Sequence, residues 1–220
     1  MPRANVKGSA LEYSEAGSGT PIVLVHGSAS DHRTWHLQRE AFAEHFRVIS
    51  FSRRFHWSNE SIPDGTDYSM DDHVRDLQAF VQTLDAAPTH LVGHSYGAFV
   101  CLLLAMRDPS LVRTLVLAEP PVITLFVSYP PKPLGLLTLF FRSPRTAAIL
   151  KFGVTGAAPA SKAFQRGDMQ QGIRTFGDAV FGSGGTTACL KHERRRSTTT
   201  SRTSGRSSSG RASCRLMLSR

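Results

Sequence analysis

The sequence predicts an α/β protein built on a doubly wound, mostly parallel sheet. Short apolar runs rich in β-branched residues, such as Ile22–Val25 and Val112–Ala118, are typical of strands buried on both faces. Segments with helical spacing separate these runs, so consecutive strands are expected to lie parallel and to be joined through helices. The expected strands are Ala10–Tyr13, Ile22–Val25, Arg47–Phe51, Thr89–Val92 and Val112–Ala118.

Three helices are expected between these strands. The first follows Asp31, whose side chain can cap it, and extends toward Phe46. The second follows Ser69 as its cap, and the third covers Ala98–Met106 and ends before Pro109. The second helix has a single apolar stripe that predicts one buried face, made of Val74, Leu77, Phe80, Val81 and Leu84.

Composition changes predict three regions along the chain. Residues 1–119 form the α/β core, residues 120–185 a helical lid, and residues 186–220 a basic tail that we expect to be disordered. The lid is inferred from Pro- and Leu-rich sequence followed by the helix-compatible segments Arg145–Phe152 and Ala163–Phe181. We expect it to cover the strand ends, where the ligand of an open parallel sheet binds.

The net charge of +9 is concentrated in the tail. Residues 186–220 contain Lys191 and eight arginines against one acid, Glu193, which gives them a charge of +8. Because the body is nearly neutral, no specific nucleic-acid partner is predicted, and association through the tail is kept as a minor alternative.

The cysteines, the most apolar window and the first residues argue against several other classes of protein. Cys101, Cys189 and Cys214 have no paired spacing and no metal-ligand pattern, so neither a metal nor a cofactor is predicted. Prolines interrupt the most apolar window, Val122–Phe141, and no membrane-spanning helix is expected there. The first residues lack the apolar core of a signal peptide, which favours a cytoplasmic location.

The sequence Gly93-His94-Ser95-Tyr96-Gly97 carries the chemistry. It is a Gly-x-Ser-x-Gly motif that follows one expected strand and opens one expected helix, the context in which such a serine is a nucleophile at a strained turn. Gly93 and Gly97 leave room for the strand and the helix to approach each other. The alternative is a glycine-rich turn whose serine only caps the helix.

From Leu11 to about Phe181 the chain resembles the α/β-hydrolase superfamily, through the strand followed by His26-Gly27 and the motif around Ser95. In detail it resembles capped esterases, lactonases and carbon–carbon bond hydrolases that act on small molecules, more than it resembles lipases or peptidases. The resemblance implies that Ser95 attacks an acyl carbonyl and forms an acyl-enzyme. It also implies that the backbone N–H groups of Tyr96 and Ser28 bind the oxyanion.

The resemblance leaves the other site residues less defined. Glu119 follows the strand Val112–Ala118, where some members of the superfamily place the triad acid; the alternative is a strand-end carboxylate that binds nearby backbone or an arginine. His26 is expected to shape its loop rather than to transfer protons. The loop Ser52–Asn59 departs from the family pattern Asp-x-Arg-Gly-x-Gly-x-Ser, and its bulky residues suggest an altered pocket wall. For His56 and Trp57 a packing role is favoured over the alternative, contact with substrate.

The family's catalytic histidine follows later strands that this chain does not show. After Gly185 the composition becomes Arg-, Ser- and Thr-rich, and His192, with no strand before it, is not expected to be the base. One adjacent reading frame can encode an amphipathic helix over this part, so our hypothesis is a C-terminal truncation or frameshift after about Gly185. Two functions follow: a serine hydrolase acting on a small ester, lactone or related acyl substrate, with activity reduced or lost, or a non-catalytic protein of the same fold that binds small molecules.

Overall fold

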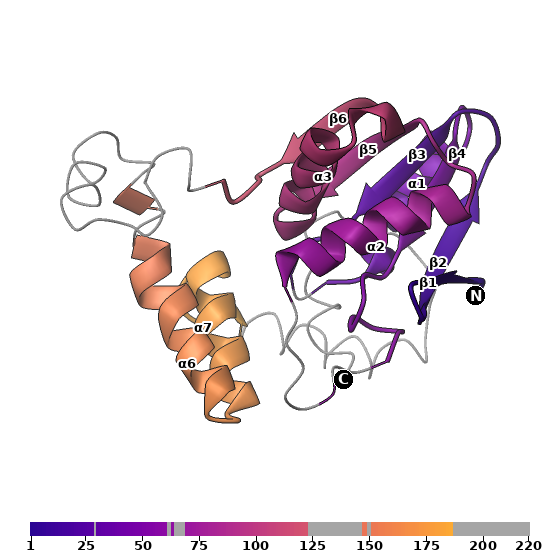
Figure 1. Cartoon of the computed structure of the whole chain (residues 1–220). Helices are drawn as coiled ribbons and strands as arrows, with labels where there is room; N and C mark the ends of the chain where they lie inside the picture. The colour runs from indigo at the N-terminus through magenta and orange to yellow at the C-terminus, as the bar shows by residue number, and fades with distance from the viewer. Residues whose placement is uncertain (29, 61–62, 64–68, 123–146, 149–150, 187–220) are drawn as a thin grey trace, which may run out of the picture. The chain divides into compact units, whose positions relative to one another are not determined.

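The computed structural model describes residues 1–28, 30–60, 63, 69–122, 147–148 and 151–186. The chain divides into two units, one through Pro121 and one from Val122 (Figure 1). Residues 123–146 of the expected lid and residues 187–220 of the expected tail, with His192, lie outside the described residues. The described part has no helix long and apolar enough to cross a membrane.

The first unit contains a six-stranded mixed sheet with the order β1-β2-β4-β3-β5-β6. Strands β4, β3, β5 and β6 run parallel, and β1 and β2 are antiparallel additions at one side. The sheet is therefore mostly parallel, as the sequence predicts. The strands are β1 (Arg3–Val6), β2 (Ser9–Ala16), β3 (Pro21–Val25), β4 (Arg47–Phe51), β5 (Thr89–His94) and β6 (Val112–Ala118).

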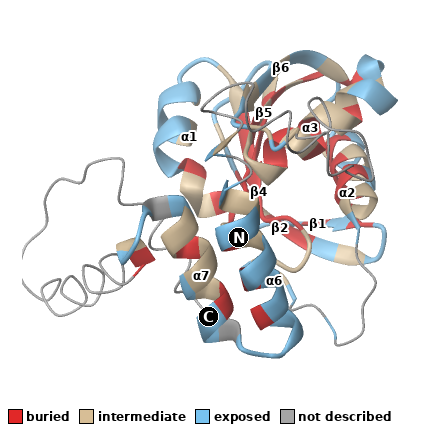
Figure 2. Cartoon of the chain, turned by 90° about the vertical axis from the view of Figure 1, so that its left-hand side faces the viewer, coloured by how far each residue is buried: buried red, intermediate tan, exposed pale blue. Residues whose placement is uncertain are grey.

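Helices pack on both faces of this sheet because side chains along its central strands alternate in direction. Val23 and Val25 of β3 belong to a core with residues of α2 (Met70–Thr83) and α3 (Tyr96–Arg107). Ile22 and Leu24 belong to a second core that includes Trp35, at the end of the short 3-10 helix η1 (His32–Trp35) that leads into α1 (His36–Phe42). Figure 2 shows buried residues gathered along the central strands.

Both expected caps are present. The Asp31 carboxylate accepts a hydrogen bond from the Arg33 N–H. The Ser69 hydroxyl accepts from the Asp72 N–H, and the Asp72 carboxylate accepts in return from the Ser69 N–H, which completes a capping box. These local hydrogen bonds fix where η1 and α2 begin.

Three expectations about the first unit were wrong. Strand β1 was not expected, because Arg3–Val6 has little β-branched character and gains its pairing from β2. Strand β6 was expected to be buried on both faces, but in the described sheet it has a neighbour on one side only, and Val116 is 53% exposed. The first helix ends at Phe42 and does not reach Phe46.

The described residues of the second unit form a helical hairpin. A π-helical turn, η4 (Gly153–Ala157), leads into α6 (Ala158–Gln165), which packs against α7 (Met169–Phe181). The single helix expected over Ala163–Phe181 is interrupted at Gly167, whose φ of +77° ends α6. The unit begins two residues after the expected lid boundary, and its role as a lid stays a prediction.

Candidate active site

Ser95 lies at a sharp turn between β5 and α3. Its φ of +51° and ψ of −121° lie in a region that costs a residue other than glycine about 1–3 kcal/mol. Its N–H donates to the Ala118 carbonyl at the end of β6, with 2.8 Å between nitrogen and oxygen. Strain of this kind persists only where the surroundings hold it, and it raises the serine above the edge of the sheet.

The glycines of the motif permit this turn. A Cβ on Gly97 would lie 2.4 Å from the carbonyl oxygens of Val25 and His26, and one on Gly93 would lie 2.5 Å from the Ala98 Cα. In both cases the obstructing atoms belong to the backbone, which cannot rotate away. The close approach of β3, β5 and α3 therefore requires glycine at both positions, as the sequence analysis expects.

Two backbone amides near Ser95 are available to a ligand. The Tyr96 N–H belongs to the first turn of α3 and has no acceptor within the helix. The Ser28 N–H makes no hydrogen bond within the described part of the chain, and Ser28 is exposed. A Cβ built on Gly27 would come within 3.1 Å of the Ser95 Cβ, so the loop that carries the second amide reaches the serine.

Glu119 lies beside this turn but contacts a different residue from the one that a catalytic triad requires. Its carboxylate is 87% exposed and lies 3.8 Å from Nε2 of His94, the residue before Ser95. Its own φ is +53°, which places a second strained residue at this edge. Among the described residues, no histidine forms a hydrogen bond with the Ser95 hydroxyl. The assignment of Glu119 as the triad acid stays a prediction.

His26 is fully buried and makes the contacts of a loop-shaping residue. Its Nε2 accepts from the Arg53 backbone N–H at 3.0 Å, which leaves the proton on Nδ1, and Nδ1 donates to the Gly27 carbonyl at 2.8 Å. Burial, and then the charge of Arg53, hold the pKa of His26 well below its ordinary value. The ring is therefore neutral and already committed to two bonds.

Arg53 is a buried residue whose importance the sequence analysis missed. It lies two residues after the end of β4 and is 3% exposed, with its guanidinium among the carbonyls of His26 and Gly27 and the rings of His56 and His73. The sequence did indicate that Arg53 lies near His26. Arg53 comes just after β4 and His26 just after β3, and the carboxyl ends of these neighbouring parallel strands lie side by side.

The two bulky loop residues have separate surroundings. His56 is half-buried, its Nδ1 lies 2.9 Å from the Arg54 carbonyl, and its Nε2 lies 3.2 Å from Nη2 of Arg53. Trp57 is 39% exposed, and the Arg33 guanidinium lies over its ring at 3.6 Å. Both side chains contact other residues of the protein, in line with the expected packing role.

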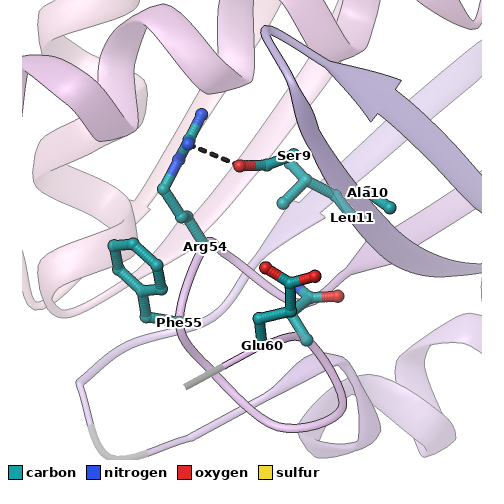
Figure 3. A pocket seen from close by; sticks show the side chains of 7 residues that line it. Ser9, Ala10, Leu11, Arg54, Phe55 and Glu60 are labelled. Atoms are coloured by element: carbon teal, nitrogen blue, oxygen red, sulfur yellow. Dashed lines mark hydrogen bonds between the residues drawn. The ribbon is translucent and has the colours of Figure 1, made fainter. Parts of the chain in front are cut away.

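A small surface recess lies beside the same loop. Arg54 donates to the Ser9 hydroxyl there (Figure 3). It also forms a partly buried ion pair with Asp76. The recess contains none of the predicted catalytic residues; it is lined by Ser9, Ala10, Leu11, Arg54, Phe55, Asn59 and Glu60. Within the described residues no group of three or more His, Cys, Asp or Glu side chains could hold a metal ion.

Comparison with known proteins agrees with this architecture. A sequence model of the alpha/beta hydrolase fold matches residues 20–179. The (E)-2-((N-methylformamido)methylene)succinate hydrolase of Acinetobacter baylyi is 32% identical over 101 residues, 46% of this chain and 38% of that protein. Epoxide hydrolase 2 of Caenorhabditis elegans is 28% identical over 118 residues, 53% of this chain and 33% of that protein.

Among solved structures, a thermophilic esterase from Thermogutta terrifontis aligns with a TM-score of 0.47 and 27% identity, over 51% of this chain and 43% of that chain. The matched part therefore spans less than half the length of each of these relatives. The mostly parallel sheet with a strained serine between β5 and α3 defines an α/β protein with a sharp strand–serine–helix turn. The family match over most of the chain shows that this protein belongs to the α/β-hydrolase fold family.

Proposed function

We propose that this chain is a serine hydrolase that cleaves a small ester, lactone or related acyl substrate through an acyl-enzyme on Ser95. The observation that carries the proposal is the strained turn at Ser95, beside which the N–H groups of Tyr96 and Ser28 have no acceptor among the described residues. Strained residues cluster at functional sites, and the ligands of open parallel sheets bind at the carboxyl edge, where this serine emerges. Two N–H donors beside it match the needs of an acyl-transfer oxyanion.

The proposed reaction has two steps. In the first, the Ser95 Oγ attacks the acyl carbonyl, gives its proton to a general base, and the negative oxygen is bound by Tyr96 and Ser28; collapse then expels the alcohol, which takes up a proton. In the second, water attacks the acyl group and Ser95 recovers its proton as the acid leaves. Loss of one donor from such a hole typically raises the barrier by about 2.7–4 kcal/mol.

Glu119 is the proposed carboxylate partner of the general base. It lies at the edge of the sheet from which Ser95 emerges, and its carboxylate lies 3.8 Å from the imidazole Nε2 of His94, which supports a carboxylate–imidazole partnership in this region. The name of the Acinetobacter relative, a hydrolase of a substituted succinate, supports a small molecule as the substrate.

Hydrolysis of p-nitrophenyl acetate by the full chain and by its Ser95→Ala variant tests the proposal. The wild-type chain is expected to be at least about tenfold faster, since the nucleophile accounts for most of the rate in such enzymes. Intact mass should show an acetyl group on the wild-type chain alone. Ser110→Ala, which changes an exposed serine in the same unit, is the matched control and should retain the wild-type rate. Equal rates for the wild-type and Ser95→Ala chains would favour a non-catalytic binding protein.

A further inference from the structure

We propose that Arg53 is a positioning residue for the oxyanion hole: its guanidinium holds the carbonyls of His26 and Gly27 and thereby directs the Ser28 N–H toward the oxyanion. The inference rests on the proposed function and adds to it the residue that orients one of the two donors. Arg53 itself does not contact the reacting atoms.

Three hydrogen bonds join Arg53 to the loop after β3. Its Nε donates to the His26 carbonyl at 3.2 Å, its Nη2 donates to the Gly27 carbonyl at 2.9 Å, and its backbone N–H donates to Nε2 of His26 at 3.0 Å. The two guanidinium bonds fix consecutive carbonyls with a planar, rigid group, which a flexible ammonium cannot reproduce. The loop is therefore held in orientation as well as in place.

The peptide group between Gly27 and Ser28 links the position of the Gly27 carbonyl to the direction of the Ser28 N–H. The Gly27 carbonyl and the Ser28 N–H belong to one planar trans unit, in which they point in opposite directions. Because the carbonyl is fixed toward Arg53, the N–H is directed away from it. Gly27 borders the Ser95 side chain, and Ser28 is exposed, so this donor is presented beside the nucleophile and accessible to a ligand.

The surroundings of Arg53 keep its guanidinium fixed. His26 adds a second donor to the Gly27 carbonyl through its Nδ1. The Arg53 Nη1 lies 3.0 Å from Nε2 of His73, and its Nη2 lies 3.2 Å from Nε2 of His56. Because a guanidinium only donates, the two imidazole nitrogens are the acceptors. Cζ lies 4.8 Å from the centre of the Tyr96 ring, a cation–π contact with the residue that supplies the other oxyanion donor.

A purely structural role for Arg53 is the competing explanation, since any buried arginine helps to hold its surroundings. The neighbouring Arg54 provides a matched comparison. Arg54 is a partly buried arginine with a bidentate carboxylate partner, Asp76, and it also donates to the Ser9 hydroxyl. Substituting either arginine by lysine keeps the charge and removes the planar guanidinium. A larger effect of Arg53→Lys than of Arg54→Lys would therefore come from the lost contacts with the loop after β3.

The test compares Arg53→Lys, Arg53→Met and Arg54→Lys with the wild-type chain. One measurement is kcat and KM for p-nitrophenyl acetate, per Ser95 that a fluorophosphonate probe can label. The other is the NMR order parameter of the Gly27 and Ser28 amides, which is about 0.85 for rigid backbone and below about 0.6 for flexible backbone. Counting only labelled sites removes the effect of unfolded molecules, and the lysine variant remains informative if the methionine variant does not fold.

For Arg53→Lys we expect kcat to fall about tenfold to a hundredfold with KM changed less than about twofold, less than the 10²–10³ lost with a whole donor. The order parameters of Gly27 and Ser28 should fall as well, and Arg54→Lys should change neither quantity. Unchanged order parameters or an unchanged kcat in Arg53→Lys would overturn the inference, as would an equal loss of kcat in Arg54→Lys. If the wild-type chain is no faster than Ser95→Ala, the proposed function fails separately, and the order parameters alone decide whether Arg53 holds the loop.

Discussion

Replacing Gly97 by alanine tests the close approach at the serine turn. The added Cβ would lie 2.4 Å from two carbonyl oxygens at the end of β3, about 1 Å inside ordinary contact. Overpacking of a rigid site typically costs 1–3 kcal/mol, and backbone neighbours place this site at the upper end, at about 3 kcal/mol. With a urea slope of about 2 kcal/mol per molar, the unfolding midpoint should fall by about 1.5 M.

Tryptophan fluorescence is a suitable probe of this unfolding, because both tryptophans of the chain, Trp35 and Trp57, lie in the first unit. The control is His94→Ala, which shortens a half-exposed side chain at the same turn and should shift the midpoint by less than about 0.3 M. A midpoint for Gly97→Ala within about 0.5 M of the wild-type value would refute the steric reasoning.

Two further predictions concern the same unit. Ser69→Ala removes the capping box of α2 and should lower the free energy of unfolding by about 1 kcal/mol, measured as a fall of about 2–4 °C in Tm; no change would show that α2 begins independently of its cap. Burial, followed by the charge of Arg53, lowers the pKa of His73 to about 2, far below the 6.5 of the unfolded chain. The unfolded chain therefore binds more protons, and stability should be lost as pH falls below about 6.5, by about 1.4 kcal/mol at pH 5.5 from His73 alone. Urea midpoints between pH 5 and 8 measure this loss, and an equally steep loss in His73→Gln would contradict the assignment to His73.

The sequence was most informative where local signals agreed. Arg47–Phe51 and Val112–Ala118 have the predicted boundaries because β-branched runs are bounded by polar or turn residues. The serine turn was predictable from Gly93 and Gly97, since each permits an approach that no other residue allows. These features depend on residues that are neighbours in the chain.

Features that depend on tertiary contacts were harder to predict from the sequence. A continuous apolar run indicates a strand but does not say whether a neighbour lies on each side, so the exposure of Val116 was not predicted. The burial of Arg53 depends on acceptors from the loop after β3 and from α2, which lie far from it in the chain. An arginine is normally expected at the surface, and only the common direction of β3 and β4 indicated another position.

The hydrogen bond from the Ser95 N–H to the Ala118 carbonyl also affects the dynamics of the strained serine. Within the described sheet, β6 is an edge strand, and edge strands are among the elements that open by local fluctuation most readily. Each time the end of β6 separates from β5, Ser95 loses the bond that fixes its amide. The lifetime of the strained conformation is therefore coupled to fraying of β6, and the fraction of molecules in which the serine is correctly oriented depends on how firmly that edge is held.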